Sequence, residues 1–287
     1  MVDPAGVAGA GAALVSGAGI PRLAALFGEA RCAVAFTGAG VSTESGIPDF
    51  RSPGGVWDRF DARELTYRSF TGSREGRRRY WALGRATYSL IRGAVPNAAH
   101  LALAALHRLG RLDCCITQNV DNLHQRGGLP ADAVIELHGN ATRARCLECG
   151  APYTRDELHA RLEDGVDVPD CAACGGIVKP HTILFGEALP EGAMHEAERR
   201  AGAADLFVVL GSSLGVYPAA YVPIHARRAG ATLAIVNLER TPLDREADLV
   251  IRARAGQVMA EVLDAVRARR AGPDKEDEAS CHRPTPR

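Results

Sequence analysis

Short apolar runs recur along the chain, and each of them ends in polar or glycine-rich sequence. Five lie at 31–40, 113–119, 134–139, 205–213 and 232–237 (RCAVAFTGAG, DCCITQN, VIELHG, DLFVVLGSS and TLAIVN). Apolar runs of this length that contain β-branched residues are typical of buried strands. Because polar residues follow them at their carboxyl ends, we predict an open, parallel, doubly wound sheet. The fold class is therefore α/β with a Rossmann-like sheet.

Other segments follow a helical pattern. PNAAHLALAALHRLG at 96–110 predicts a helix between two of the strands, with Gly110 as the residue that stops it. AGQVMAEVLDAVRAR at 255–269 predicts the last helix. Residues from about 52 to 95 carry many arginines and aromatic residues in helical runs without a strand, which indicates a small helical insertion.

The 287 residues allow one large domain and a smaller one, and the 46% hydrophobic content can support a core. We expect the Rossmann-like domain at 21–141 and 180–270, with a flexible N-terminal segment at 1–20. A polar, charged, proline-bearing tail at 271–287 is expected to be disordered. Residues 142–179 contain four cysteines and little apolar sequence, so this small domain needs a source of stability other than its own core.

The four cysteines of the small domain form two C-x-x-C pairs, Cys146 with Cys149 and Cys171 with Cys174. A glycine follows each pair, which suits a tight turn around a thiolate. Two disulfides or four unrelated cysteines are alternatives, but no secretion signal is recognisable and cytosolic disulfides are rare. The spacing therefore predicts one tetrahedral Zn²⁺ site. Four protein ligands leave no position for water, so this zinc is structural and not catalytic.

Charge and hydropathy exclude several kinds of partner. Lys and Arg number 34 and Asp and Glu number 34, so no net field favours nucleic acid or anionic lipid. A zinc ribbon can bind nucleic acid, but the cysteine pairs have no basic aromatic surroundings. The longest apolar runs fall short of the roughly 20 residues that a membrane-spanning helix needs. We expect a cytoplasmic monomer.

Polar side chains follow two of the predicted strands directly. Gln118, Asn119 and Asp121 come after one strand, and His138 comes after the next. The carboxyl edge of such a sheet is where open α/β folds bind ligands. The alternative role for any one of these residues is to cap a helix or to face solvent in a loop.

The stretch TGAGVSTESGIPDFR at 37–51 begins like a dinucleotide-binding loop and then departs from it. Gly38 and Gly40 provide half of a G-x-G-x-x-G pattern, but the next glycine is Gly46. A hydride-transferring dehydrogenase would place an acidic residue at the end of a second strand about 20 positions later. Asp58 is near that position, but the sequence around it has no strand pattern.

The motifs together resemble the sirtuins, the NAD-dependent protein lysine deacylases. GAGVSTESGIPDFR, TQNVDNLH, HG, the two C-x-x-C pairs, FGE, GSSLGVYP and VNLERTP occur in the order seen in that family, from about Arg31 to the last helix. The resemblance implies that NAD is a co-substrate. The carbonyl oxygen of an acyl-lysine attacks C1′ of the nicotinamide ribose, nicotinamide leaves, and the acyl group passes to ADP-ribose.

The resemblance also implies roles for individual residues. His138 matches the catalytic histidine, a general base toward a ribose hydroxyl, and Asn119 and Gln118 match residues that position the ribose and a water. Gly38, Ala39 and Gly40 would let the backbone approach the pyrophosphate, with amide groups at a helix start stabilising its charge, and Gly46 would serve the return of the loop. Asp121 and the residues Ile47, Pro48 and Asp49 match the pocket that receives the nicotinamide carboxamide. Phe50 would cover the ribose face and Arg51 would approach phosphate or ribose oxygens. The cofactor-binding set that it implies is Gly38, Ala39, Gly40, Ile47, Pro48, Asp49, Phe50, Arg51, Gln118, Asn119, Asp121, Gly211, Ser212, Ser213, Asn237, Leu238 and Ala255.

By the same resemblance, the acylated protein or peptide would lie as an extended strand between two segments of the chain. These segments are Phe185, Gly186 and Glu187 on one side and Leu214, Gly215 and Val216 on the other. Main-chain hydrogen bonds of this kind tolerate many peptide sequences. Phe185 and Val216 would form walls of the acyl-lysine tunnel, with core packing as the alternative role.

The acyl group is expected to be neutral, with acetyl first. The desuccinylating branch of the family carries a Tyr-x-x-Arg pair in the helical insertion, and Gly84 and Thr87 align with it here. Without a cation in the tunnel, the carboxylate of a succinyl group would be buried unpaired, at a cost of several kcal/mol. Desuccinylation, other deacylations and protein ADP-ribosylation remain alternatives, as does a non-enzymatic binding module. Lys179 stands where Arg is common in the family, which could alter a phosphate or domain contact.

Overall fold

The computed structural model of the protein describes residues 19–49 and 66–270. Six strands form one sheet in the order β3-β2-β1-β7-β8-β9, and every pairing in it is parallel. They are β1 (Ala33–Thr37), β2 (Cys114–Thr117), β3 (Val134–Glu136), β7 (Leu206–Leu210), β8 (Thr232–Val236) and β9 (Leu249–Ile251). The predicted doubly wound α/β fold is confirmed. The sequence pattern did not reveal β9, because three apolar residues are too short a run to distinguish from a loop.

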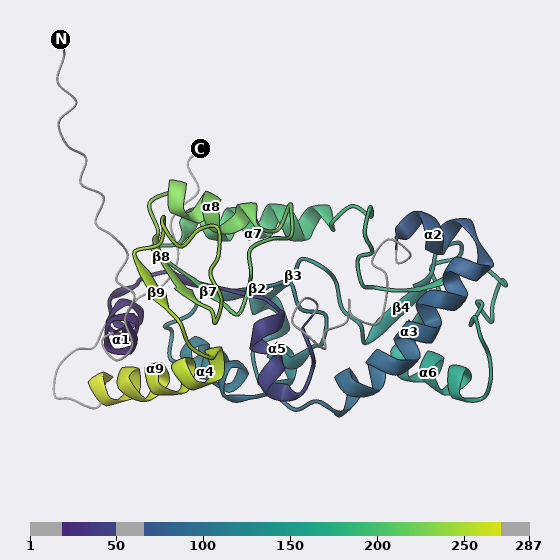
Figure 1. Ribbon diagram of the computed structural model, residues 1–287, viewed down its shortest axis with the longest axis horizontal. Helices are drawn as coiled ribbons and strands as arrows, with labels where there is room; N and C mark the ends of the chain where they lie inside the picture. The colour runs from purple at the N-terminus through teal and green to yellow at the C-terminus, as the bar shows by residue number, and fades with distance from the viewer. Residues whose placement is uncertain (1–18, 50–65, 271–287) are drawn as a thin grey trace, which may run out of the picture.

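Helices cover both faces of this sheet (Figure 1). One face packs against α1 (Gly19–Glu29), α4 (Ala98–Arg108) and α9 (Ala255–Arg270). The other face packs against α7 (Glu191–Ala203) and α8 (Tyr221–Arg228). Successive residues of β1 alternate between the two cores, as the pleat of a strand requires. A sheet buried on both faces explains the continuous apolar runs in the sequence.

Both predicted helices are confirmed, and each ends close to its expected position. After α4 the chain turns at Gly110, whose φ of +67° is the left-handed conformation of a helix stop. The last helix, α9, begins at Ala255 as predicted. By contrast, α1 begins at Gly19, inside the N-terminal segment that was expected to be flexible. Residues 1–18 and 271–287 lie outside the described residues, and the expected domain boundaries stay predictions.

A second group of elements lies at one end of the molecule, on the right of Figure 1. Its antiparallel sheet has the order β5-β4-β6, formed by β4 (Arg143–Cys146), β5 (Pro152–Thr154) and β6 (Val178–Pro180). It is accompanied by α6 (Arg155–Glu163) and by α2 (Tyr67–Gly72) and α3 (Arg74–Gly93), which fall within the predicted helical insertion.

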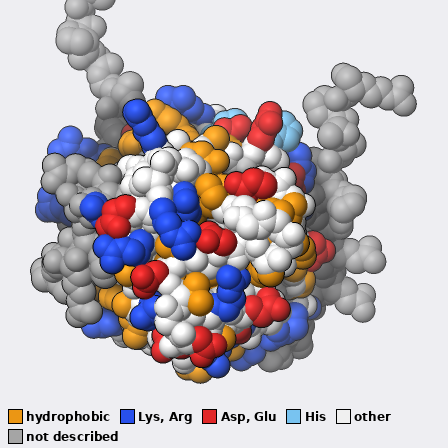
Figure 2. All heavy atoms as spheres, turned by 90° about the vertical axis from the view of Figure 1, so that its right-hand side faces the viewer, with side chains coloured by type: hydrophobic (Ala, Val, Ile, Leu, Met, Phe, Trp, Pro, Cys, Tyr) orange, Lys and Arg blue, Asp and Glu red, His pale blue; other side chains and the backbone are white. Residues whose placement is uncertain are grey.

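The cysteine-bearing segment and the helical insertion share one hydrophobic core. Phe70 and Trp81 from the insertion pack with Leu158, Leu162 and Val178 from the cysteine-bearing segment. Residues 142–179 were expected not to form a core alone. In the structure, large aromatic side chains from α2 and α3 complete the core of this segment. The face at this end carries acidic and basic side chains intermixed, without a large patch of one sign among the described residues (Figure 2).

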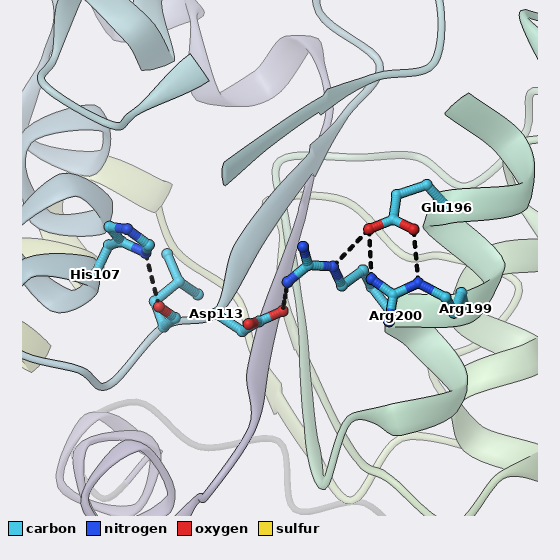
Figure 3. A network of polar contacts seen from close by, with 6 residues as sticks. His107, Asp113, Glu196, Arg199 and Arg200 are labelled. Atoms are coloured by element: carbon cyan, nitrogen blue, oxygen red, sulfur yellow. Dashed lines mark hydrogen bonds and ion pairs between the residues drawn. The ribbon is translucent and has the colours of Figure 1, made fainter. Parts of the chain in front are cut away.

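An ion-pair network fastens the amino edge of the large sheet to α7 (Figure 3). Arg200 Nη1 lies 2.6 Å from Asp113 Oδ2, just before β2, and Arg200 Nε lies 2.8 Å from Glu196 Oε1. Arg199 and Arg200 together lower the pKa of Glu196 to about 2. This network lies at the amino ends of the strands. The candidate site lies at the opposite edge of the sheet, at the carboxyl ends. None of the helices in the described ranges is long and apolar enough to cross a membrane.

Candidate active site

The site is built where the chain leaves the adjacent strands β1 and β7. From β1 the sheet grows outward through β2 and β3 on one side, and from β7 through β8 and β9 on the other. This point of reversal is where doubly wound folds bind ligands. Gly38 N donates to Leu210 O at 3.0 Å and Gly40 N donates to Gly211 O at 2.8 Å. The two loops that leave these strands therefore touch each other directly.

Close contact between these loops requires glycine at three positions. A Cβ atom at Gly38 would lie 2.7 Å from Gly211 O, and one at Gly40 would lie 2.9 Å from the same oxygen. Gly211 itself has a φ of +57°, and a Cβ atom there would lie 2.4 Å from Val41 N. The predicted reason for Gly38 and Gly40 was the approach of a pyrophosphate. The structure adds a second reason, the packing of one loop on the other.

After Gly38 the chain makes two 3-10 turns in place of the helix start that the resemblance implied. The turns span Ala39–Val41 and Thr43–Ser45, and they end at Gly46 with a φ of +83°. We call residues 38–46 the glycine loop. Gly46 thus returns the chain, as predicted, and Ile47 N donates to Ser42 O at 3.3 Å.

The polar residues after β2 lie against the glycine loop. Asn119 Nδ2 donates to Gly38 O at 3.0 Å and to Ser42 Oγ at 3.1 Å. Asp121 is 5% exposed and accepts from Ser42 Oγ at 2.6 Å and from Leu123 N at 2.9 Å. Both amide hydrogens of Asn119 are used in this way, which leaves Oδ1 to accept from a ligand. The structure therefore brings both residues together with the loop of β1.

Gln118 connects the same edge to the loop after β7. Its Nε2 atom donates to Ser212 Oγ at 2.8 Å, and Leu214 N donates to the same hydroxyl at 3.3 Å. The hydroxyl of Ser212 is thus held in place from two sides. Leu214 is buried and has a φ of +53°, a conformation uncommon for a residue with a side chain.

His138 follows β3 at the same edge of the sheet. Its Nδ1 atom lies 3.0 Å from Gln118 O, and its own carbonyl oxygen accepts from Ile183 N at 2.9 Å. Burial lowers the pKa of His138, although the hydrogen bond to Gln118 acts in the opposite direction. Gly139 has a φ of +74°, and a Cβ atom there would lie 1.8 Å from His181 O. The glycine of the HG motif is thus required by the contact with the chain that leaves β6.

The remaining residues predicted to contact NAD are found in several places. Asn237, at the end of β8, donates through Nδ2 to Glu239 O at 2.9 Å. Leu238 is 60% exposed, Ser213 is exposed, and Ala255 is buried at the start of α9. Ile47, Pro48 and Asp49 follow the glycine loop and are partly or largely exposed. Phe50 and Arg51 lie outside the described residues.

The residues predicted to flank an acylated peptide are held in place by contacts with neighbouring elements. Phe185 is 49% exposed, and its carbonyl oxygen accepts from Tyr67 N at 2.9 Å. Glu187 Oε2 lies 2.9 Å from Lys179 Nζ and accepts from Leu184 N at 2.9 Å. Gly186 takes a φ of +77°, and Val216 O accepts from Ala220 N at 2.9 Å. Lys179, noted in the sequence as a departure from the family, is therefore paired under the FGE segment.

The four cysteines converge as predicted. Their Sγ atoms all lie within 4.8 Å of one another. Cys146 Sγ lies 3.5 Å from Cys174 Sγ, and Cys149 Sγ lies 3.6 Å from Cys171 Sγ. A Zn–S bond of about 2.3 Å implies about 3.8 Å between sulfurs of a tetrahedral site, whereas a disulfide needs about 2 Å. The glycines after the pairs, Gly150 and Gly175, have φ values of +74° and +72°. The cluster could hold one Zn²⁺ ion.

With this geometry in place, comparison with known proteins decides the family. The Sir2 family model matches residues 38–218. This chain belongs to the Sir2 family. The NAD-dependent protein deacetylase 1 of Bradyrhizobium diazoefficiens is 47% identical over 242 residues, which cover 84% of this chain and 94% of that protein.

Solved Sir2 structures have the same fold. A Sir2 protein with a p53 peptide and NAD⁺ is 38% identical, with a TM-score of 0.77, and the match covers 85% of this chain and 96% of that one. A Sir2 variant with a deacetylated p53 peptide and 3′-O-acetyl ADP-ribose is also 38% identical, with a TM-score of 0.80, covering 85% of this chain and 97% of that one.

For this Sir2 chain, sequence reasoning missed residues that complete the site geometry. Ser42 lies within the quoted glycine loop motif, so its hydroxyl was visible but was not assigned a partner. Asn97 lay inside the segment 96–110 that was predicted as a helix and was given no role, although it is the N-cap of α4. Its side chain in fact reaches the glycine loop, 56 residues earlier in the chain.

Proposed function

We propose that this chain is an NAD-dependent protein lysine deacetylase, which transfers the acetyl group of acetyl-lysine to ADP-ribose and releases nicotinamide. The observation that carries the proposal is the meeting of His138, Gln118, Asn119 and the glycine loop at the reversal point of the sheet. Family membership and the deacetylase names of the relatives support it.

The hydrogen bond of His138 indicates which of its ring atoms acts as the base. Gln118 O can only accept, so Nδ1 of the neutral ring carries the hydrogen and Nε2 keeps the lone pair. Because burial lowers the pKa of His138, the ring is neutral at pH 7. Nε2 is therefore the atom that would accept a proton from a ribose hydroxyl.

The residues near the glycine loop would hold the dinucleotide. The hydroxyl of Ser212 suits phosphate and ribose oxygens, and Oδ1 of Asn119 suits a hydroxyl donor. The buried carboxylate of Asp121 already accepts two hydrogen bonds from the protein. We therefore propose that Asp121 shapes the nicotinamide end of the site mainly by holding Ser42 in place.

The preference for a neutral acyl group is supported by the positions of nearby cations. Gly84 packs against Arg155, whose guanidinium carbon lies 4.8 Å from the ring centroids of both Trp81 and Tyr88. Thr87 Oγ1 donates to Leu83 O at 3.0 Å. Arg85 Nε lies 3.9 Å from Glu163 Oε1. Arg155 lies against the two aromatic rings and Arg85 faces Glu163, both between α3 and α6, so we propose acetyl-lysine over succinyl-lysine.

The test is a reaction with acetylated and succinylated forms of one peptide. We expect NAD-dependent release of nicotinamide and formation of O-acetyl-ADP-ribose with the acetyl peptide, and little reaction with the succinyl peptide. His138→Ala serves as the inactive control. Failure of folded, zinc-loaded protein to form acetyl-ADP-ribose would reject the proposal. Labelled NAD that becomes attached to protein would favour the alternative of ADP-ribosyl transfer.

We also propose the cytoplasm as the location, because the four cysteines must stay reduced to hold zinc. Cell fractionation followed by immunoblotting tests this part. Recovery of the protein outside the cytoplasmic fraction would contradict it.

A further inference from the structure

Asn97, at the start of α4, holds the two turns of the glycine loop. It caps the amino end of α4, and its Nδ2 atom donates to Val41 O at 2.8 Å and to Ser45 Oγ at 2.9 Å. Val41 ends the first 3-10 turn and Ser45 ends the second. One amide group therefore joins both turns to the start of a core helix.

Asn97 is itself fixed by α4. Its Oδ1 atom accepts from Ala99 N at 3.0 Å, and its main-chain N donates to His100 Nδ1 at 3.2 Å. His100 is fully buried, and α4 packs against α9 within the main core. The amide that reaches the glycine loop is thus attached to a rigid part of the fold.

A second contact connects the same loop to α9. The carboxylate of Glu44 accepts from Gly256 N at 2.8 Å, in the first turn of that helix. A Cβ atom at Gly256 would lie 2.5 Å from Glu44 Oε2, so a larger residue there would force the Glu44 carboxylate to move. Two helices that pack on each other therefore both hold the glycine loop.

The turns held in this way carry the residue that reaches the site. Ser42 lies between them, donates to Asp121 Oδ2 at 2.6 Å and accepts from Asn119 Nδ2 at 3.1 Å. A shift of either turn would move Ser42 and, with it, Asn119 and Asp121. We infer that Asn97 is a positioning residue, which sets the glycine loop for the dinucleotide and not for the acylated peptide. This inference rests on the proposed function for its NAD-binding consequence.

Asn97→Asp separates this role from helix capping. Aspartate keeps an oxygen that can accept from Ala99 N, so α4 stays capped. It lacks both donated hydrogens, and its carboxylate would face the carbonyl oxygen of Val41. Thr154→Ala is the matched control, because Thr154 Oγ1 caps α6 by accepting from Glu157 N at 3.2 Å and α6 lies in the cysteine-bearing segment.

We expect Asn97→Asp to raise the KM for NAD about tenfold, as the loss of well-formed hydrogen bonds implies, and to leave the KM for acetyl peptide unchanged. Thr154→Ala should change neither constant, although it lowers Tm. Hydrogen exchange followed by mass spectrometry should show faster exchange at 41–46 in Asn97→Asp and unchanged exchange elsewhere in the large sheet. An unchanged KM for NAD, or equal rises for both substrates, would overturn the inference.

Calorimetric titration with NAD in the absence of peptide makes the test independent of turnover. A weaker Kd for Asn97→Asp than for the unchanged protein supports the positioning role, and an equal Kd overturns it. If the unchanged protein binds NAD but forms no acetyl-ADP-ribose, the proposed function fails while the comparison of Kd values still stands.

Discussion

The Nδ1 atom of His138 lies 3.0 Å from the main-chain carbonyl oxygen of Gln118. A main-chain acceptor cannot be removed by substitution of Gln118, so the orientation of the ring depends on the backbone at the end of β2. This contact fixes which nitrogen of the neutral ring is basic. It also ties the base to the residue whose side chain holds Ser212.

The pH dependence of activity should follow the neutral form of His138. Burial lowers its pKa below the usual 6.5, so at any pH in this range a smaller fraction of His138 is protonated than of an ordinary histidine. We therefore expect the decline in kcat/KM on the acid side to be centred below pH 6.5. A pH profile with saturating NAD measures this, and a decline centred above pH 6.5 would contradict it.

The pairing of Lys179 with Glu187 should matter for the peptide more than for NAD. Lys179 is 4% exposed and also donates to Thr182 O at 2.6 Å, so it holds the segment before Phe185. Removal of one partner of a buried ion pair costs about 3–5 kcal/mol. We expect Lys179→Met to lower Tm and to raise the KM for acetyl peptide several-fold, with a much smaller effect on NAD.

Lys179→Arg is the control for that prediction, because it keeps a cation next to Glu187. Steady-state kinetics with each substrate varied in turn measures the effect. The prediction is wrong if the arginine variant is as impaired as the methionine variant, or if the KM for NAD rises equally.

Gly84 in α3 should resist substitution in spite of its helical position. Alanine usually stabilises the interior of a helix by about 1 kcal/mol relative to glycine. Here a Cβ atom would lie 2.5 Å from Arg155 Nη2, and that side chain is 3% exposed between two aromatic rings. We expect Gly84→Ala to lower the free energy of unfolding. Gly93→Ala, in the same helix with no atom within 4 Å of the added carbon, should leave it unchanged or raise it.

Urea unfolding followed by circular dichroism compares these two variants. Equal stability of Gly84→Ala and Gly93→Ala would show that Arg155 moves aside at little cost, against the tight packing that the structure describes.

Removal of zinc should destabilise more than the cysteine-bearing segment. Cys146 and Cys171 are buried in the same core as Trp81 and Phe70, so the metal supports the helical insertion as well. We expect one zinc per chain by atomic absorption, and a lower Tm with loss of activity after chelation. Cys171→Ser should reproduce both effects. Unchanged helix content in the metal-free protein would contradict the shared core.

Local sequence patterns predicted much of this structure. The features that they did not predict depend on contacts between residues far apart in the sequence. The cysteine pairs and the cap at Gly110 depend on neighbours within a few residues, and both were predictable. The packing of Gly38 and Gly40 on Gly211 depends on the pairing of β1 with β7, which lie far apart in the sequence. Asn97 lay within the predicted helix at 96–110, and its partners Val41 and Ser45 follow only from the tertiary fold.

Acid should destabilise the protein through two buried histidines below the site. His100 and His124 lie with their ring centroids 4.9 Å apart, and burial lowers their pKa values to about 4 and about 3, from 6.5. Between pH 6.5 and about 4, these histidines become protonated in the unfolded chain but stay neutral in the folded protein. Stability is therefore complete above pH 6.5 and falls as pH falls, by up to about 1.4 kcal/mol per pH unit for each histidine.

Above pH 4.5 the loss of stability from the histidines can be measured without a contribution from the carboxylates of Glu75 and Glu196. The pKa values of Glu75 and Glu196 are lowered to about 2 from 4.5, so their contribution is lost only below pH 4.5. His124→Gln keeps a group that can bond to Thr37 Oγ1, which lies 2.9 Å from His124 Nε2, but glutamine does not titrate. We expect this variant to be less stable at pH 7 and to show a shallower decline from pH 6.5 to 4.5. Urea midpoints across that range measure the slope, and an unchanged slope would show that His124 is protonated in the folded protein.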